Sequence, residues 1–83
     1  MEIIFTEHAK FKLNVLKGHG FAFTENQIKK VIENPDFVRE TKFNRLAAIK
    51  SLNDELALRI IYEEGDTITI VTIMVVKRDR YEI

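Results

Sequence analysis

The sequence predicts an α+β domain in which two N-terminal helices pack on one face of a twisted antiparallel β-sheet. Apolar residues recur at helical spacing before Pro35 and run in strand-like segments after it. Turn signals at Asn53-Asp54 and Gly65-Asp66 separate the later segments at hairpin distances. The chain has 83 residues, which is the length of one small domain, and we assign residues 1–83 to it.

Two helices are predicted in the first half of the chain, after a short edge strand at residues 2–5. Thr6 is a suitable N-cap for the first helix, which the Gly18-His19-Gly20 segment ends. The second helix begins with a capping box formed by Thr24 and Gln27. It ends at Asn34-Pro35, because the residue before proline is pushed out of the helical region.

Four strands are predicted in the second half, at residues 37–40, 46–52, 56–63 and 67–77. Hairpin turns join three of them consecutively, which predicts an antiparallel meander. The last strand is apolar at nearly every position, which favours a central place in the sheet with both faces covered.

Alternation along residues 56–63 places Arg59 on the face of the sheet that the helices leave open. The opposite face, which meets the helices, receives Leu58, Ile60 and Tyr62. If Gly65-Asp66 is a two-residue turn, Arg59 pairs with Thr72; a three-residue turn shifts this register by one.

The composition of the chain argues against several classes of function. The net charge is zero, with 13 Lys+Arg and 13 Asp+Glu, which argues against a nucleic-acid binder that is basic throughout but allows a local basic site. The absence of cysteine excludes disulfides and thiolate metal sites. The two histidines do not have the spacing of a metal-ligand set, so we expect neither metal nor cofactor. No signal peptide or membrane-length apolar run is evident, so we expect a cytoplasmic protein that does not contact the membrane.

Basic side chains and a tyrosine cluster near the end of the sequence. After the last apolar run come Lys77, Arg78, Arg80 and Tyr81. Arginine forks match phosphate oxygens and stay charged at any working pH, and a tyrosine can transfer a proton. If Arg59 pairs with Thr72, Lys77 lies about 17 Å further along the strand, so the tail must fold back to share a site with Arg59.

Several segments in a fixed order resemble the RelE/BrnT superfamily of small toxins. They are Phe5-Thr6-Glu7-His8-Ala9, the Lys17-Gly18-His19-Gly20-Phe21 turn, Asn34-Pro35-Asp36, Arg59-Ile60-Ile61-Tyr62-Glu63 and the basic, tyrosine-bearing tail. The chain is similar also to uncharacterised small domains that share the Thr-x-His-Ala opening. The likeness covers nearly the whole chain.

The resemblance implies the toxin of a type II toxin-antitoxin system, a metal-independent endoribonuclease that cleaves mRNA, on the ribosome or free. Its partners are then mRNA and a cognate antitoxin protein. By position, the resemblance implies Arg59, Arg80 or Arg78, Tyr81 and His8 as catalytic residues, and we favour Arg80 as the late arginine. Lys77, Arg78 and Arg45 are our candidates for binding RNA phosphates.

Other interpretations stay open. The same fold can serve as a non-catalytic module that binds a protein target such as gyrase, or as a domain without toxic activity. Arg59 can form a cross-strand ion pair, and the basic tail can simply protect a sheet edge. The short first strand leaves an edge at which a homodimer can form.

Overall fold

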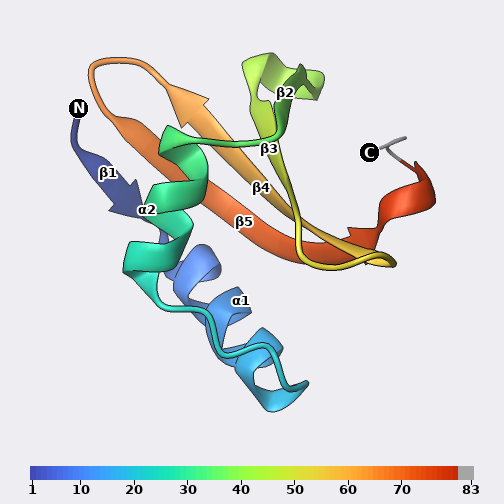
Figure 1. Cartoon of the computed structure of the whole chain (residues 1–83). Coiled ribbons are helices and arrows are strands. Elements are labelled where there is room, and N and C mark those ends of the chain that lie inside the picture. The colour runs from blue at the N-terminus through green and yellow to red at the C-terminus, as the bar shows by residue number, and fades with distance from the viewer. Residues whose placement is uncertain (81–83) are drawn as a thin grey trace.

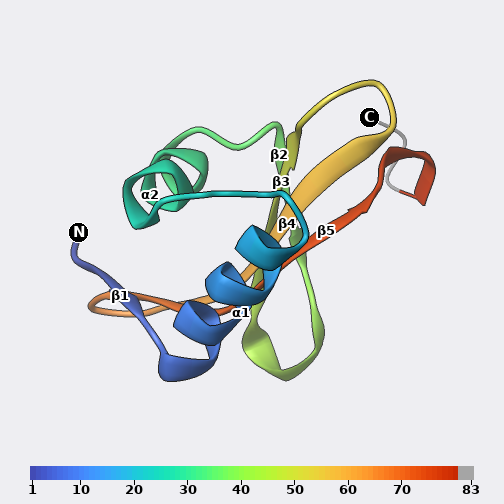
Figure 2. The same ribbon diagram turned by 90° about the horizontal axis from the view of Figure 1, so that it is seen from below.

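The computed structural model describes residues 1–80, and of Arg80 only the backbone. Helices α1 and α2 cover one face of a single five-stranded sheet, and the other face is open (Figures 1 and 2). The α+β class predicted from the sequence is confirmed. The strands and helices are β1 (Ile3–Phe5), α1 (Glu7–Gly18), α2 (Glu25–Glu33), β2 (Phe37–Glu40), β3 (Leu46–Ser51), β4 (Leu56–Glu64) and β5 (Ile68–Lys77). Two single 3-10 turns complete the described chain, η1 (Lys42–Asn44) and η2 (Arg78–Arg80).

The sheet is mixed rather than antiparallel, so that part of the prediction is wrong. The strand order is β1-β5-β4-β3-β2, and β1 pairs with β5 in parallel. Two strands joined by a hairpin turn must pair in antiparallel fashion, but no hairpin joins β1 to β5. Both helices and three strands lie between them in the sequence, and a long connection of this kind allows parallel pairing. The central strand is therefore β4, and β5 lies between β4 and the short β1.

Both predicted helix starts are confirmed. The Thr6 hydroxyl accepts a hydrogen bond from the Ala9 backbone N–H at 3.0 Å. At α2, Thr24 and Gln27 form a reciprocal capping box with bonds of 2.8 and 3.1 Å. These bonds satisfy backbone donors that have no partner inside the helix, which fixes where each helix begins.

The main core lies between the helices and the sheet. Its fully buried side chains include Ile28 of α2, Ile60 of β4 and Ile73 of β5. Tyr62 is buried in the same cluster, and this burial raises the pKa of its phenol, with a further contribution from the Glu64 carboxylate. A second cluster occupies the open face and consists of Ala47, Ile49, Ala57 and Ile61, with half-buried residues around it.

Arg59 lies on the open face as predicted, but it pairs with Met74 rather than Thr72. Two features move the register. The turn between β4 and β5 has three residues, since Glu64 pairs with Ile68, and a β-bulge between Ile61 and Tyr62 adds one more position. Lys77 is consequently only three positions beyond the partner of Arg59, or about 10 Å along the strand.

Neither helix of residues 1–80 combines the length and the apolar character needed to cross a membrane.

Candidate functional site

The open face of the sheet carries a ladder of paired residues. Two rows cross β2, β3, β4 and β5 on this face: Phe37–Ile49–Arg59–Met74 and Arg39–Ala47–Ile61–Thr72. In both rows the middle positions hold aliphatic side chains, apart from Arg59. The face is therefore an apolar floor with arginines set into it at Arg39 and Arg59.

The β2–β3 connection turns this face into a hollow. The β2–β3 connection and strands β4 and β5 line an open hollow of about 500 Å³, whose lining residues are Glu40, Thr41, Lys42, Phe43, Arg45, Arg59, Ile61, Val71 and Thr72. Ile61 and Val71 contribute apolar surface to it, while Lys42, Arg45 and Arg59 contribute three cations. The hollow is thus an electropositive site on a protein whose net charge is zero.

Carboxylates are few in this hollow. Among its described lining residues the only acidic side chain is Glu40, at the end of β2. Glu63 reaches the region from β4 and pairs with Arg45, as described next.

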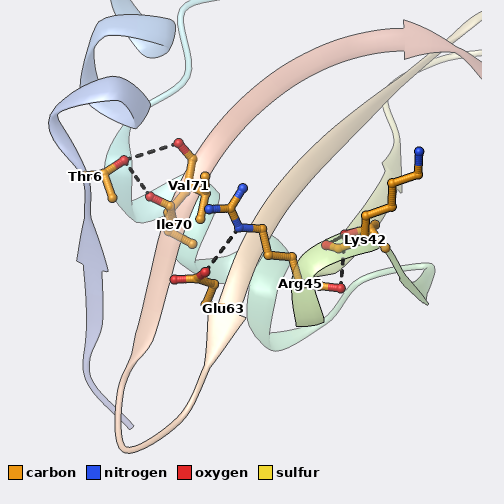
Figure 3. A network of polar contacts seen from close by, with 7 residues as sticks. Thr6, Lys42, Arg45, Glu63, Ile70 and Val71 are labelled. Atoms are coloured by element: carbon orange, nitrogen blue, oxygen red, sulfur yellow. Dashed lines mark hydrogen bonds and ion pairs between the residues drawn. The ribbon is translucent and has the colours of Figure 1, made fainter.

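Arg45 is held over the sheet by an ion pair. Its Nε lies 3.1 Å from Oε2 of Glu63, and Figure 3 shows the side chain extending from the loop to meet that carboxylate. Both side chains are substantially exposed, so this pair contributes little stability. Its effect is to orient the guanidinium, and Lys42 points away from the pair in the same view.

Arg59 is half-buried between its neighbours on the floor. Its Nη1 lies 3.5 Å from the sulfur of Met74, a weak acceptor. A guanidinium cannot lose its charge at any pH the protein meets, and apolar surroundings strengthen its attraction for an anion.

His8 stands at the rim of the hollow. Its Nε2 lies 3.1 Å from the hydroxyl oxygen of Thr72, which lines the hollow at the bulged part of β5. Thr6, two residues earlier, donates a hydrogen bond to the Ile70 carbonyl at 2.8 Å and contacts the Val71 carbonyl oxygen at 3.2 Å (Figure 3). The start of α1 is thereby fastened to β5, which places the imidazole beside the site.

The basic tail lies elsewhere. Lys77 lines a different hollow, of about 340 Å³, together with three carboxylates: Asp54, Glu55 and Asp79. Asp54 and Glu55 belong to the β3–β4 turn, which lies at the end of the sheet opposite the β2–β3 loop (Figures 1 and 2). The acidic lining of this hollow is a poor place for a phosphate.

Arg78 forms hydrogen bonds to the β3–β4 turn. Its Nη1 donates to the Asn53 carbonyl at 2.7 Å, and its backbone N–H donates to the Glu55 carbonyl at 2.9 Å. Both contacts secure the β3–β4 turn against β5. The side chain of Arg80 and the whole of Tyr81 lie outside the described residues.

Phe43 was not among the sequence-predicted site residues. Its side chain is 82% exposed at the tip of the β2–β3 loop, and its backbone is left-handed, with φ 63° and ψ 34°. Asn44 is left-handed too, with φ 57°. The Arg45 N–H approaches the Lys42 carbonyl at 3.4 Å across this pair, an arrangement typical of a type I′ turn. Turns of this type favour Asn or Gly, and phenylalanine costs about 1–2 kcal/mol there.

A sequence signal for this loop does exist. Lys42-Phe43-Asn44-Arg45 places an aromatic residue between cations, with Asn44 as a turn former, between two strand-like segments. Arg39 also was missed, although it follows Phe37 by two residues and lies on the same face of β2. Its guanidinium carbon lies 5.1 Å from the centroid of the Phe37 ring.

In residues 1–80, no three or more His, Cys, Asp and Glu side chains are grouped closely enough to hold a metal ion. The described site presents arginines, a lysine, a histidine beside a threonine, the Glu40 carboxylate and an exposed aromatic ring.

The fold and this site together define a class: a small α+β domain with a cationic, aromatic-edged hollow on the open face of its sheet. Comparisons with known protein families, with curated proteins and with solved structures find no match to the chain.

Proposed function

We propose that this protein is a metal-independent endoribonuclease and the toxin of a type II toxin-antitoxin pair, with a RelE-like fold, mRNA as substrate and an antitoxin as its inhibitor. One observation carries the proposal: Lys42 and Arg45 of the β2–β3 connection and Arg59 of β4 line a single hollow. The resemblance of the sequence to RelE/BrnT toxins supplies the biological context.

The reaction uses the RNA's own 2′-hydroxyl. A base removes its proton, the 2′-oxygen attacks the adjacent phosphorus, and the bond to the 5′-oxygen breaks, leaving a 2′,3′-cyclic phosphate and a 5′-hydroxyl. Arg59 and Arg45 stabilise the charge that develops on the phosphoryl oxygens. Two described groups exchange protons with the 2′-oxygen and the leaving 5′-oxygen. They are His8, which contacts Thr72 at the rim, and Glu40 within the hollow.

The test is cleavage of RNA by the purified protein, in EDTA, with free mRNA and with mRNA on ribosomes. Arg59→Met keeps an apolar stem of similar length beside Met74 and removes the charge, and we expect it to lower the cleavage rate about 100-fold or more. Arg59→Lys keeps the charge but loses the planar fork, so we expect only partial rescue.

Lys77→Ala is the matched control, since Lys77 is an exposed cation outside the hollow. We expect it to cleave RNA like the wild type. Equal losses in the Lys77 and Arg59 variants, with circular dichroism showing both folded, would place the chemistry elsewhere. Wild-type protein that cleaves neither form of mRNA would overturn the ribonuclease proposal itself.

The toxin assignment is tested separately, by induced expression in a bacterial host. We expect growth arrest with loss of mRNA, and relief of both in Arg59→Met. Arrest with intact mRNA would contradict the ribonuclease and indicate a protein target.

A further inference from the structure

We propose that Phe43 is a base-stacking platform that receives a nucleotide of single-stranded RNA whose phosphates lie in the adjoining hollow. This inference rests on the proposed function in taking RNA as the ligand, and adds how the nucleobase is recognised.

The first argument is the conformation of the loop. Phenylalanine is a poor choice for a left-handed turn position, where Asn or Gly would relieve the strain, yet here it occupies one with its ring in solvent. Its side chain is 82% exposed, so core packing does not explain its presence. An exposed aromatic ring kept in a strained backbone is an outlier of the kind found at ligand-binding positions.

The second argument is that the loop is braced rather than loose. Thr41 and Arg45 close it through a backbone hydrogen bond of 2.8 Å, and the Thr41 hydroxyl adds a bond of 3.1 Å to the same Arg45 carbonyl. The Arg45–Glu63 ion pair fastens the loop to β4 (Figure 3). A ring presented on a braced turn loses little conformational freedom when a ligand stacks on it.

The third argument is charge. Lys42 precedes Phe43, Arg45 follows two residues later, and Arg59 lies in the hollow that the loop encloses. Aromatic rings beside a cationic groove are the usual means by which proteins bind single strands, because every base offers a π-face and every linkage a phosphate. A protein partner would be favoured by a broad apolar rim, and here the ring is flanked by cations instead.

The chain contains no tryptophan, so Phe43→Trp introduces a single fluorescent reporter at the proposed platform. Phe23→Trp is the control, because Phe23 lies in the connection between α1 and α2, packs against the main core and is not among the residues that line the hollow. The probe is a short 2′-O-methyl oligoribonucleotide, which lacks the nucleophile and cannot be cleaved. A second probe with abasic sites offers phosphates without bases.

We expect the oligoribonucleotide to quench the indole emission of the Phe43→Trp variant and leave that of the Phe23→Trp variant unchanged. The abasic probe should bind without quenching. Phe43→Asn removes the ring and suits the turn. We expect it to weaken binding about tenfold or more, measured by anisotropy of a labelled probe, while raising the Tm by several degrees. If the Phe43 ring had only a structural role, Phe43→Asn would lower the Tm rather than raise it.

The outcomes separate this inference from the function on which it rests. Quenching of the Phe43→Trp variant, in a protein that does not cleave ordinary RNA, would overturn the ribonuclease and support the platform. Cleavage of RNA, with unchanged emission of the Phe43→Trp variant and unchanged binding by Phe43→Asn, would overturn the platform, leaving the ring as a contact for a protein. Absence of any probe binding at low salt would overturn the platform, while cleavage of free or ribosome-bound mRNA decides the ribonuclease.

Discussion

Thr6→Ala tests whether one hydroxyl holds the helical layer to the sheet. Thr6 accepts from the Ala9 N–H at 3.0 Å as the N-cap of α1 and donates to the Ile70 carbonyl at 2.8 Å. Loss of an N-cap side chain costs about 1 kcal/mol, and loss of one further hydrogen bond costs about 1 kcal/mol more. The free energy of unfolding should therefore fall by about 2 kcal/mol, which in a domain of this size lowers Tm by about 8–16 °C.

The assay is urea unfolding followed by circular dichroism, with two matched variants. Thr24→Ala removes the N-cap of α2, whose hydroxyl bonds only within its own capping box, so we expect about half the loss. Thr6→Ser keeps both hydrogen bonds and should stay close to the wild type. If Thr6→Ala costs no more than Thr24→Ala, or Thr6→Ser costs as much as Thr6→Ala, the bond to β5 contributes nothing and the reasoning is refuted.

Two further predictions concern charges around the sheet. A hydrogen bond from the Ser51 N–H lowers the pKa of Asp36 below its ordinary 3.8, so its ionised form stabilises the fold above that pH, and this contribution is lost as pH falls through the lowered pKa. Wild type should therefore exceed Asp36→Asn in urea midpoint near neutral pH, and the gap should close in acid; a gap independent of pH would contradict this. Glu63→Gln removes a negative charge beside the cationic hollow but keeps an oxygen that accepts from the Arg45 Nε, so we expect single-stranded RNA to bind up to about fivefold tighter with little change in stability. Weaker binding of RNA by Glu63→Gln, measured by anisotropy, would show that the pair positions Arg45 productively.

Local signals allowed most of the fold to be predicted. The N-caps at Thr6 and Thr24 and the alternation around Arg59 depend on neighbours a few residues away, and all three are confirmed. The parallel pairing of β1 with β5 could not be predicted in this way, because no short motif encodes the partner of a strand near the other end of the chain.

The register of Arg59 depended on two local details that the pattern left open. Gly65-Asp66 reads as a two-residue turn, but Thr67 joins it, and the bulge leaves no signature in a run of β-branched residues. Each adds one position, so the partner of Arg59 moved by two.

The candidate site was only partly predictable for a related reason. Arg59, Arg45 and His8 were recognised from the sequence, and the structure places all three in or beside one hollow. The tail cations were favoured because they are adjacent in sequence, whereas proximity in space depends on which end of the sheet a segment reaches. Phe43 was missed because its exposure and left-handed backbone are properties of the folded loop.

The pairing of β1 with β5 also bears on the order in which the chain folds during its synthesis. Ile3 pairs with Ile68 and Phe5 with Ile70, so β1 cannot pair until β5, the last strand made, is available. Contacts of such long sequence separation slow folding, because closing the loop costs entropy before the contact forms. The hollow itself needs Val71 and Thr72. A nascent chain whose β5 has not yet emerged therefore lacks part of the hollow, and with it the surface proposed to bind RNA.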